Sequence, residues 1–123
     1  MIYDNIIFAD LKGKTLTSIE VREDKELVTF TTDIGEIYIC RHYQDCCEHV
    51  SVEDVAGDLE DLIGTPILSA EESTQKKSYG RDWGSSQTWT FYKLATIKGS
   101  VTIRWYGTSN GYYSEGVAFE KIA

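Results

Sequence analysis

The stretch TWTFYKLATIKGSVTIRWYGTSNGYYSEGVAFEKI, residues 88–122, decides the fold class of this chain. Apolar and polar residues alternate along it, with many aromatic and β-branched side chains, which is the pattern of β-strands. The segments IKGS and TSNG interrupt the alternation, and Asn110-Gly111 suits the positive φ angles of a tight hairpin turn. The stretch therefore predicts three antiparallel strands joined by two short turns.

The alternation also divides the side chains of these three strands between two faces. The face that we predict to be core carries Trp89, Phe91, Ala95 and Ile97, then Val101, Ile103 and Trp105, then Tyr113, Val117 and Phe119. The opposite face carries Thr90 and Tyr92 on the first strand and Arg104 and Tyr106 on the second. Together with Lys76, Lys77 and Arg81, this opposite face could line a pocket for an anionic ligand.

The first half of the chain predicts more strands of the same kind. Alternating runs at 14–22, 26–32 and 33–41 read as three sequential antiparallel strands, and 48–54 as a fourth with Val50 and Val52 inward. The segment 57–67, GDLEDLIGTPI, predicts a short helix, with Asp58 as its N-cap and Gly64 as a left-handed C-cap. A strand at 66–73 follows, and the polar segment 74–87 predicts a long mobile hairpin loop. We expect a single domain, 1–123, that is mainly β: an antiparallel sheet wrapped into a small barrel or sandwich, with one or two short helices.

Acidic residues are concentrated in one part of the chain. The net charge is −8, and residues 44–72 contain nine acidic residues and no lysine or arginine. The overall sign disfavours direct binding to nucleic-acid phosphates, and a concentrated negative surface indicates a basic protein partner or serves solubility. The residues that we expect to bind such a partner are Asp45, Glu48, Glu53, Asp54, Asp58, Glu60 and Asp61.

The chain carries no sequence feature of a membrane or secreted protein. No run approaches the ~20 apolar residues of a membrane span, and MIYDNIIFADLKGK lacks the parts of a signal peptide. We therefore expect a cytosolic protein whose three cysteines are reduced thiols.

The stretch CRHYQDCCEHV, residues 40–50, contains residue types that bind metals or act as nucleophiles. The weak metal candidates are Cys40, His42, Cys46, Cys47 and His49. Their spacing matches no zinc motif, and free cysteines are often small apolar core residues, so we predict a structural stretch without metal or cofactor. No nucleophile elbow, metalloprotease motif or phosphate loop occurs, and His42 with Asp45 or Glu48 is an unspecific acid/base pair, so we predict no enzyme.

Three blocks carry a resemblance: QDCCE, GDLEDLIGTPI and IRWYGTSNGYYSE. With the sequence around them, they resemble an uncharacterised family of small domains encoded by bacteriophages and bacterial genomes. The resemblance covers nearly the whole chain and supplies no catalytic residues. It implies a phage or prophage gene, and small acidic proteins of that origin are often inhibitors of host defence.

Two functional hypotheses follow, with a third behind them. The first is a non-enzymatic inhibitor, similar to anti-CRISPR proteins, whose acidic surface occupies a basic groove on a host protein such as a nucleic-acid-processing enzyme. The second is a protein that sequesters a nucleotide signal with the basic and aromatic residues Arg81, Trp83, Arg104, Tyr106 and Tyr112. The third, a metalloprotein or enzyme built on the cysteine and histidine stretch, is the weakest.

Overall fold

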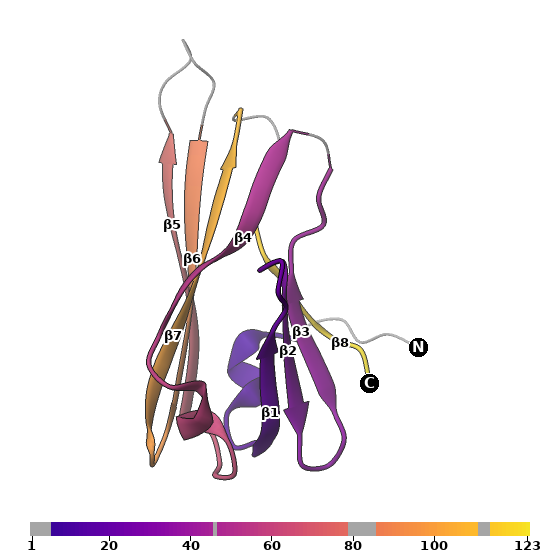
Figure 1. Cartoon of the computed structure of the whole chain (residues 1–123), viewed down its shortest axis with the longest axis vertical. Coiled ribbons are helices and arrows are strands. Elements are labelled where there is room, and N and C mark those ends of the chain that lie inside the picture. Colours follow the sequence, from indigo (N-terminus) through magenta and orange to yellow (C-terminus); the bar gives the residue numbers. More distant parts are fainter. Residues whose placement is uncertain (1–5, 46, 79–85, 111–113) are drawn as a thin grey trace.

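Two antiparallel four-stranded sheets lie face to face in the computed structural model, which describes residues 6–45, 47–78, 86–110 and 114–123 (Figure 1). The first sheet has the order β1 (Leu16–Val21), β2 (Leu27–Thr32), β3 (Ile37–Arg41) and β8 (Ala118–Lys121). The second has the order β4 (Glu48–Ala56), β7 (Gly99–Ser109), β6 (Ser86–Thr96) and β5 (Ser69–Ser78). The predicted mainly β fold is confirmed, and of its two forms the structure has the sandwich, because neither sheet closes into a barrel.

One hydrophobic core fills the space between the two sheets. Its largest fully buried side chains include Trp105, Tyr92, Phe8 and Phe30. Phe8 comes from the 3-10 helix η1 (Phe8–Leu11), and its ring centroid lies 4.6 Å from that of Tyr92 and 6.1 Å from that of Phe30. A short N-terminal helix therefore supplies a ring that contacts both sheets.

The predicted helix after β4 is a single 3-10 turn, η2 (Leu59–Leu62). Asp58 is its N-cap as expected, since its Oδ1 accepts a hydrogen bond from the Glu60 amide at 3.0 Å. Gly64, with a φ of +89°, follows the helix in the left-handed region, also as expected. The four residues of η2 are too few for an α-helix. None of the helices in the described ranges is long enough to cross a bilayer.

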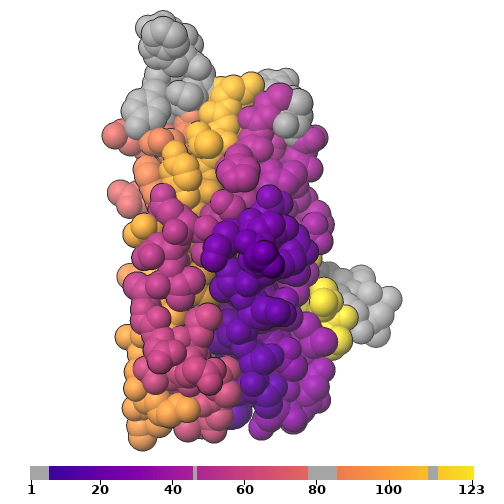
Figure 2. Space-filling model, viewed as in Figure 1, coloured from indigo at the N-terminus to yellow at the C-terminus, as the bar shows by residue number. Residues whose placement is uncertain are grey.

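Contacts between the sheets close one lateral edge of the sandwich. Leu16 forms a bridge with Ile63, and its carbonyl accepts a hydrogen bond from the Gly64 amide at 2.9 Å. The Val52 amide donates to the Lys25 carbonyl at 2.7 Å. Figure 2 shows the result, with the indigo N-terminal segment packed against the magenta segment that contains β4 and η2.

Two predicted connections are wrong. In the segment 74–87, predicted to be a loop, residues 74–78 and 86–87 are strand, because β5 and β6 stay paired from Ser69↔Ala95 as far as Ser78↔Ser86, and residues 79–85 lie outside the described residues. The last predicted hairpin is absent, because β8 pairs with β3 and β7 lies between β4 and β6. Phe119 explains the position of β8: its ring stacks on that of Tyr38 at 5.5 Å, which places the strand over the core.

On β6 the structure buries the opposite face from the one that the sequence predicted. Tyr92 and Leu94 are buried, whereas Trp89 and Phe91 lie half-buried on the outer face of the sheet, and Ile97 in the following turn is 81% exposed. On β7 the predicted inner residues Val101, Ile103 and Trp105 are buried as expected, Phe119 packs against the core, and Tyr113 lies outside the described residues. Two large rings are therefore left on an outer sheet surface.

Candidate functional site

The outer face of the second sheet brings aromatic and polar side chains into adjacent rows. Trp89 on β6 is opposite Gln75 on β5 and Tyr106 on β7, and in the next row Phe91 is opposite Arg104. Residues directly opposite each other on antiparallel strands point to the same face, so these side chains form one continuous surface.

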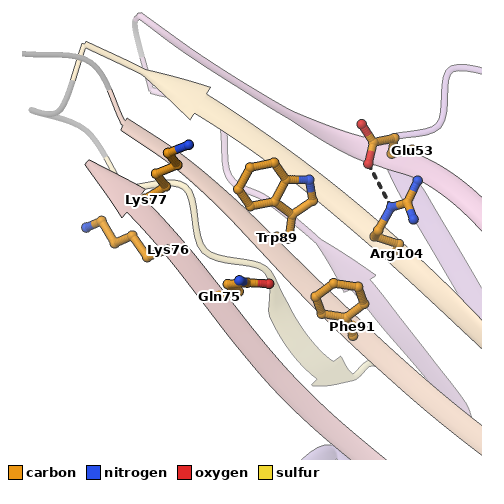
Figure 3. Close-up of a pocket in the computed structure, with 7 residues that line it drawn as sticks. All are labelled: Glu53, Gln75, Lys76, Lys77, Trp89, Phe91 and Arg104. Atoms are coloured by element: carbon orange, nitrogen blue, oxygen red, sulfur yellow. Dashed lines mark hydrogen bonds and ion pairs between the residues drawn. The ribbon is translucent and has the colours of Figure 1, made fainter. Parts of the chain in front are cut away.

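A hollow of about 510 Å³ lies on this surface. It is lined by Glu53, Gln75, Lys76, Lys77, Trp89, Phe91 and Arg104. Figure 3 shows the two rings in succession along β6, with the lysines of β5 on one side and Arg104 with Glu53 on the other. We name this hollow the outer-face site. Its volume is within the range of ~300–1,000 Å³ that small-ligand sites occupy.

Direct contacts hold several of its side chains in place. Arg104 Nε donates to Glu53 Oε1 at 2.7 Å, and each of these side chains is 39% exposed. The Trp89 ring lies 5.2 Å from that of Tyr106 at an interplanar angle of 46°, and the Tyr106 hydroxyl accepts a hydrogen bond from Gln87 Nε2 at 2.6 Å. The indole and the guanidinium are thereby positioned before any ligand arrives.

The charge of the outer-face site differs from that of the whole chain. Three cationic side chains, Lys76, Lys77 and Arg104, line it together with one carboxylate, Glu53. The chain as a whole has a net charge of −8. The site is therefore a local positive region, which attracts anions even on an acidic protein.

The residues predicted for ligand binding are only partly placed here. Arg104 lines the outer-face site and Tyr106 contacts Trp89 beside it, whereas Arg81, Trp83 and Tyr112 lie outside the described residues. Thr90 and Tyr92, which were also expected on this face, are buried on the other side of the sheet. Trp89 and Phe91 were assigned to the core because the face of β6 was predicted the wrong way round, and Gln75 of β5 was assigned to the predicted loop 74–87.

The acidic residues predicted to bind a partner do not form one exposed patch. Glu48 has a 1% exposed side chain and pairs with His42 at 2.9 Å, Glu53 pairs with Arg104, and Asp58 caps η2. The half-buried Asp61 lies against Gly99, where an added Cβ would be 2.7 Å from its Oδ2. Five of the seven are exposed, namely Asp45, Glu53, Asp54, Asp58 and Glu60.

The cysteine and histidine stretch is divided between core and surface. Cys40 is free and buried, and burial raises the pKa of its thiol well above the ordinary value. Cys47 is disulfide-bonded, so the expectation of three reduced thiols is wrong, and Cys46 lies outside the described residues. His49 is exposed and lies 3.4 Å from the Ser51 hydroxyl. Within the described ranges, no three histidine, cysteine or acidic side chains are grouped as a metal site would need.

His42 contacts two other segments of the chain. Its Nε2 lies 2.9 Å from Glu48 Oε2, and its Nδ1 lies 2.6 Å from the Gly116 carbonyl. Glu48 also accepts a hydrogen bond from the Asp45 amide at 2.7 Å. The atoms that face the two ring nitrogens are a carbonyl oxygen and a carboxylate oxygen, so each nitrogen lies against an oxygen acceptor. These contacts connect the end of β3 with the start of β4 and with the segment before β8.

A second buried carboxylate, Glu115, was not anticipated from the sequence. Thr88 donates to its Oε1 at 2.6 Å, and the Ser86 and Ser109 hydroxyls donate to its Oε2. Burial raises the pKa of Glu115, but the three hydroxyl donors outweigh burial and leave the pKa below its ordinary value. The only hint in the sequence is the run of hydroxyl residues on alternate positions 86, 88 and 90.

Glu115 also explains the inverted face of β6. The hydroxyl residues must point inward to reach its carboxylate, so the aromatic residues between them point outward. Gly107 leaves the necessary space on β7, because a Cβ there would lie 3.0 Å from that of Glu115 and 2.9 Å from Val50 Cγ2. A buried polar cluster thereby places Trp89 and Phe91 in the outer-face site.

Fold and site together define a small β-sandwich protein with a positively charged, aromatic hollow on the outer face of one sheet. The chain belongs to the family described as Domain of unknown function (DUF7448), whose model matches residues 9–119. No curated protein and no solved structure matches it.

Proposed function

We propose that the protein is a binding protein, and that the outer-face site takes a small anionic ligand with a flat aromatic ring, such as a nucleotide. The observation that carries this proposal is the placement of three cationic side chains around the half-buried rings of Trp89 and Phe91, which line the same hollow. Lysine and arginine side chains neutralise phosphate, and aromatic rings stack on bases. In a phage or prophage setting, such a protein would sequester a nucleotide signal in the host cytosol.

Binding rather than catalysis fits the chemistry of the described lining residues. Glu53 is the only carboxylate among them, and it is already paired with Arg104. General acid–base catalysis needs a positioned proton donor and acceptor beside the reacting atoms. The cationic and aromatic residues of the outer-face site instead supply charge neutralisation and stacking, so we assign them a binding role.

Replacing Trp89 with alanine is expected to weaken nucleotide binding about 5- to 150-fold, because stacking on one aromatic side chain contributes about 1–3 kcal/mol. Titration calorimetry with a panel of linear and cyclic adenine and guanine nucleotides measures the effect. The control is Ile97→Ala, which truncates an 81% exposed side chain in the β6–β7 turn, away from the outer-face site. If the unmodified chain gives no binding heat with any nucleotide of the panel, the result contradicts this function.

An acidic-surface inhibitor is the second proposed function. It is supported by the exposed carboxylates of Asp54, Asp58 and Glu60, which lie in a 29-residue stretch, 44–72, without lysine or arginine. On this proposal the partner is a basic groove of a host nucleic-acid enzyme, bound more weakly as salt increases. Its rank is second because Glu48 is buried and Glu53 is paired within the chain.

Charge reversal at Glu53, Asp54, Glu60 and Asp61 tests the second function. We expect the four lysine substitutions to abolish salt-sensitive binding to a nuclease captured from a bacterial host, since complementary charges would become repulsive. Pull-down at two salt concentrations measures it. The control carries lysines at Glu20 on β1 and Glu23 in the β1–β2 turn, both of which are exposed. Inhibition or binding that survives the four reversals contradicts an acidic interface.

A further inference from the structure

β5 is a long edge strand whose outer side is open. Among the described residues it pairs only with β6, and every residue from Glu71 to Lys77 is exposed. Every second residue of such an edge directs its N–H and C=O groups away from the sheet, where another strand can pair with them. The strand contains no proline that would prevent this pairing. The open edge is therefore competent to accept a further strand.

The opposite lateral edge of the same sheet is occupied. The β4 side is covered by contacts from the first sheet, including the hydrogen bond from the Val52 amide to the Lys25 carbonyl. Figure 1 shows β5 as the outermost strand of its sheet. Further strand pairing by this sheet is thus directed to β5.

The charges of β5 are arranged antisymmetrically about its midpoint. Glu71 and Glu72 lie on one side of Thr74, and Lys76 and Lys77 lie on the other at matching distances. When a second copy of the strand pairs in the antiparallel direction, a two-fold axis at Thr74 places Glu71 opposite Lys77 and Glu72 opposite Lys76. Opposite charges directly across an antiparallel pair are stabilising, and like charges are destabilising. Because of the two-fold symmetry each of these two pairs occurs twice, and a shift of the register by two residues in either direction loses all four pairs.

We propose that β5 is an interface for a second copy of this chain, which adds its own β5 in the antiparallel direction with Thr74 on the two-fold axis. The sheet that contains β5 in one copy then joins the same sheet of the other copy, and the two form one continuous sheet across the dimer. Because residues that face each other across an antiparallel pair share a face, both outer-face sites lie on the same side of the joined sheet. Glu71 of the second copy lies opposite Lys77, which lines the outer-face site. The second copy therefore completes the rim of that site.

The association is expected to be weak. A pair of edge strands buries less than the ~1,200 Å² typical of stable interfaces, and its charge pairs remain in contact with solvent. The dimer should therefore depend on protein concentration and weaken at high salt.

Molar mass measured by light scattering or sedimentation, across about a hundredfold range of chain concentration, tests the proposal. We expect the mass to rise from that of one chain, 13.9 kDa, to twice that value. Glu71→Lys and Lys77→Glu each place like charges across both ends of the strand pair, so each variant alone should dimerise at least about tenfold more weakly. An equimolar mixture of the two variants should restore dimers, because each end then pairs a lysine with a glutamate.

Glu23→Lys is the matched control, since it makes the same charge change at an exposed residue of the β1–β2 turn and should leave the dimer unchanged. An unmodified chain that stays monomeric, or a dimer that Glu71→Lys does not weaken, overturns the proposal. The measurement uses no nucleotide, and Glu71 is outside the lining of the outer-face site. Failure of the dimer and failure of nucleotide binding are therefore distinguishable.

Discussion

Replacing His42 with alanine is expected to lower the free energy of unfolding by about 3–5 kcal/mol, because it removes the imidazole that pairs with the buried Glu48 carboxylate. The exposed fractions of the two side chains are 5% and 1%, so water cannot replace the lost contact. The Gly116 carbonyl loses its hydrogen bond as well. Urea unfolding followed by circular dichroism measures the change.

His49→Ala is the matched control, because His49 is exposed on β4 and should change stability by less than about 0.5 kcal/mol. A double variant with alanine at both His42 and Glu48 should lose less than the sum of the single variants, since no charge is then left buried. Equal small losses for His42→Ala and His49→Ala would show that the pair contributes nothing to folding.

Replacing Glu115 with alanine is expected to lower the free energy of unfolding by about 2–4 kcal/mol, since buried donors without an acceptor cost about 1–3 kcal/mol each. Three hydroxyls lose their acceptor, although Ser86 and Ser109 lie 3.4 Å apart and can bond to each other. The total is therefore expected to be smaller than three independent losses. Glu23→Ala, at an exposed turn residue, provides the baseline in the same urea unfolding assay.

The pH dependence of stability gives a second measurement on Glu115. Its pKa in the folded protein lies below the ordinary value of 4.5, so the carboxylate stabilises the fold at pH values above 4.5. That contribution is lost as the pH falls from 4.5 through the lowered pKa. The difference in stability between the unmodified chain and Glu115→Gln should shrink over the same acidic range. A difference independent of pH would contradict an ionised Glu115.

The strands themselves could be predicted from alternation because it depends on local sequence alone. The hairpins β1–β2, β2–β3 and β6–β7 are consecutive in the chain, and their turns are short. The pairing of β8 with β3 depends on where Phe119 packs, and no local pattern contains that information. Asn110-Gly111 is a good hairpin signal by composition, yet the strands on either side of it belong to different sheets.

The site could be predicted only in part, for a related reason. Arg104 and Tyr106 were placed on the outer face because β7 has an uninterrupted apolar inner row. On β6 both rows contain aromatic residues, so hydrophobicity alone selects the wrong face. The deciding partner is Glu115, which is distant in sequence from Ser86 and Thr88. Burial of a satisfied carboxylate outweighed burial of Trp89 and Phe91.

The positions of β7 and β8 determine when the chain can fold during its synthesis. β7 lies between β4 and β6, and β8 completes the other sheet beside β3. Neither sheet can therefore be completed before residues 99–121 have been synthesised. Until the ribosome has released those residues, β4 lacks β7, the strand with which it pairs in the described part of the chain, and one edge of β6 is unpaired. Pairing between strands that are distant in sequence slows folding, and until it is complete the unpaired strand edges can promote aggregation. We therefore expect the nascent chain to remain protease-sensitive and dependent on chaperones until translation has passed β8.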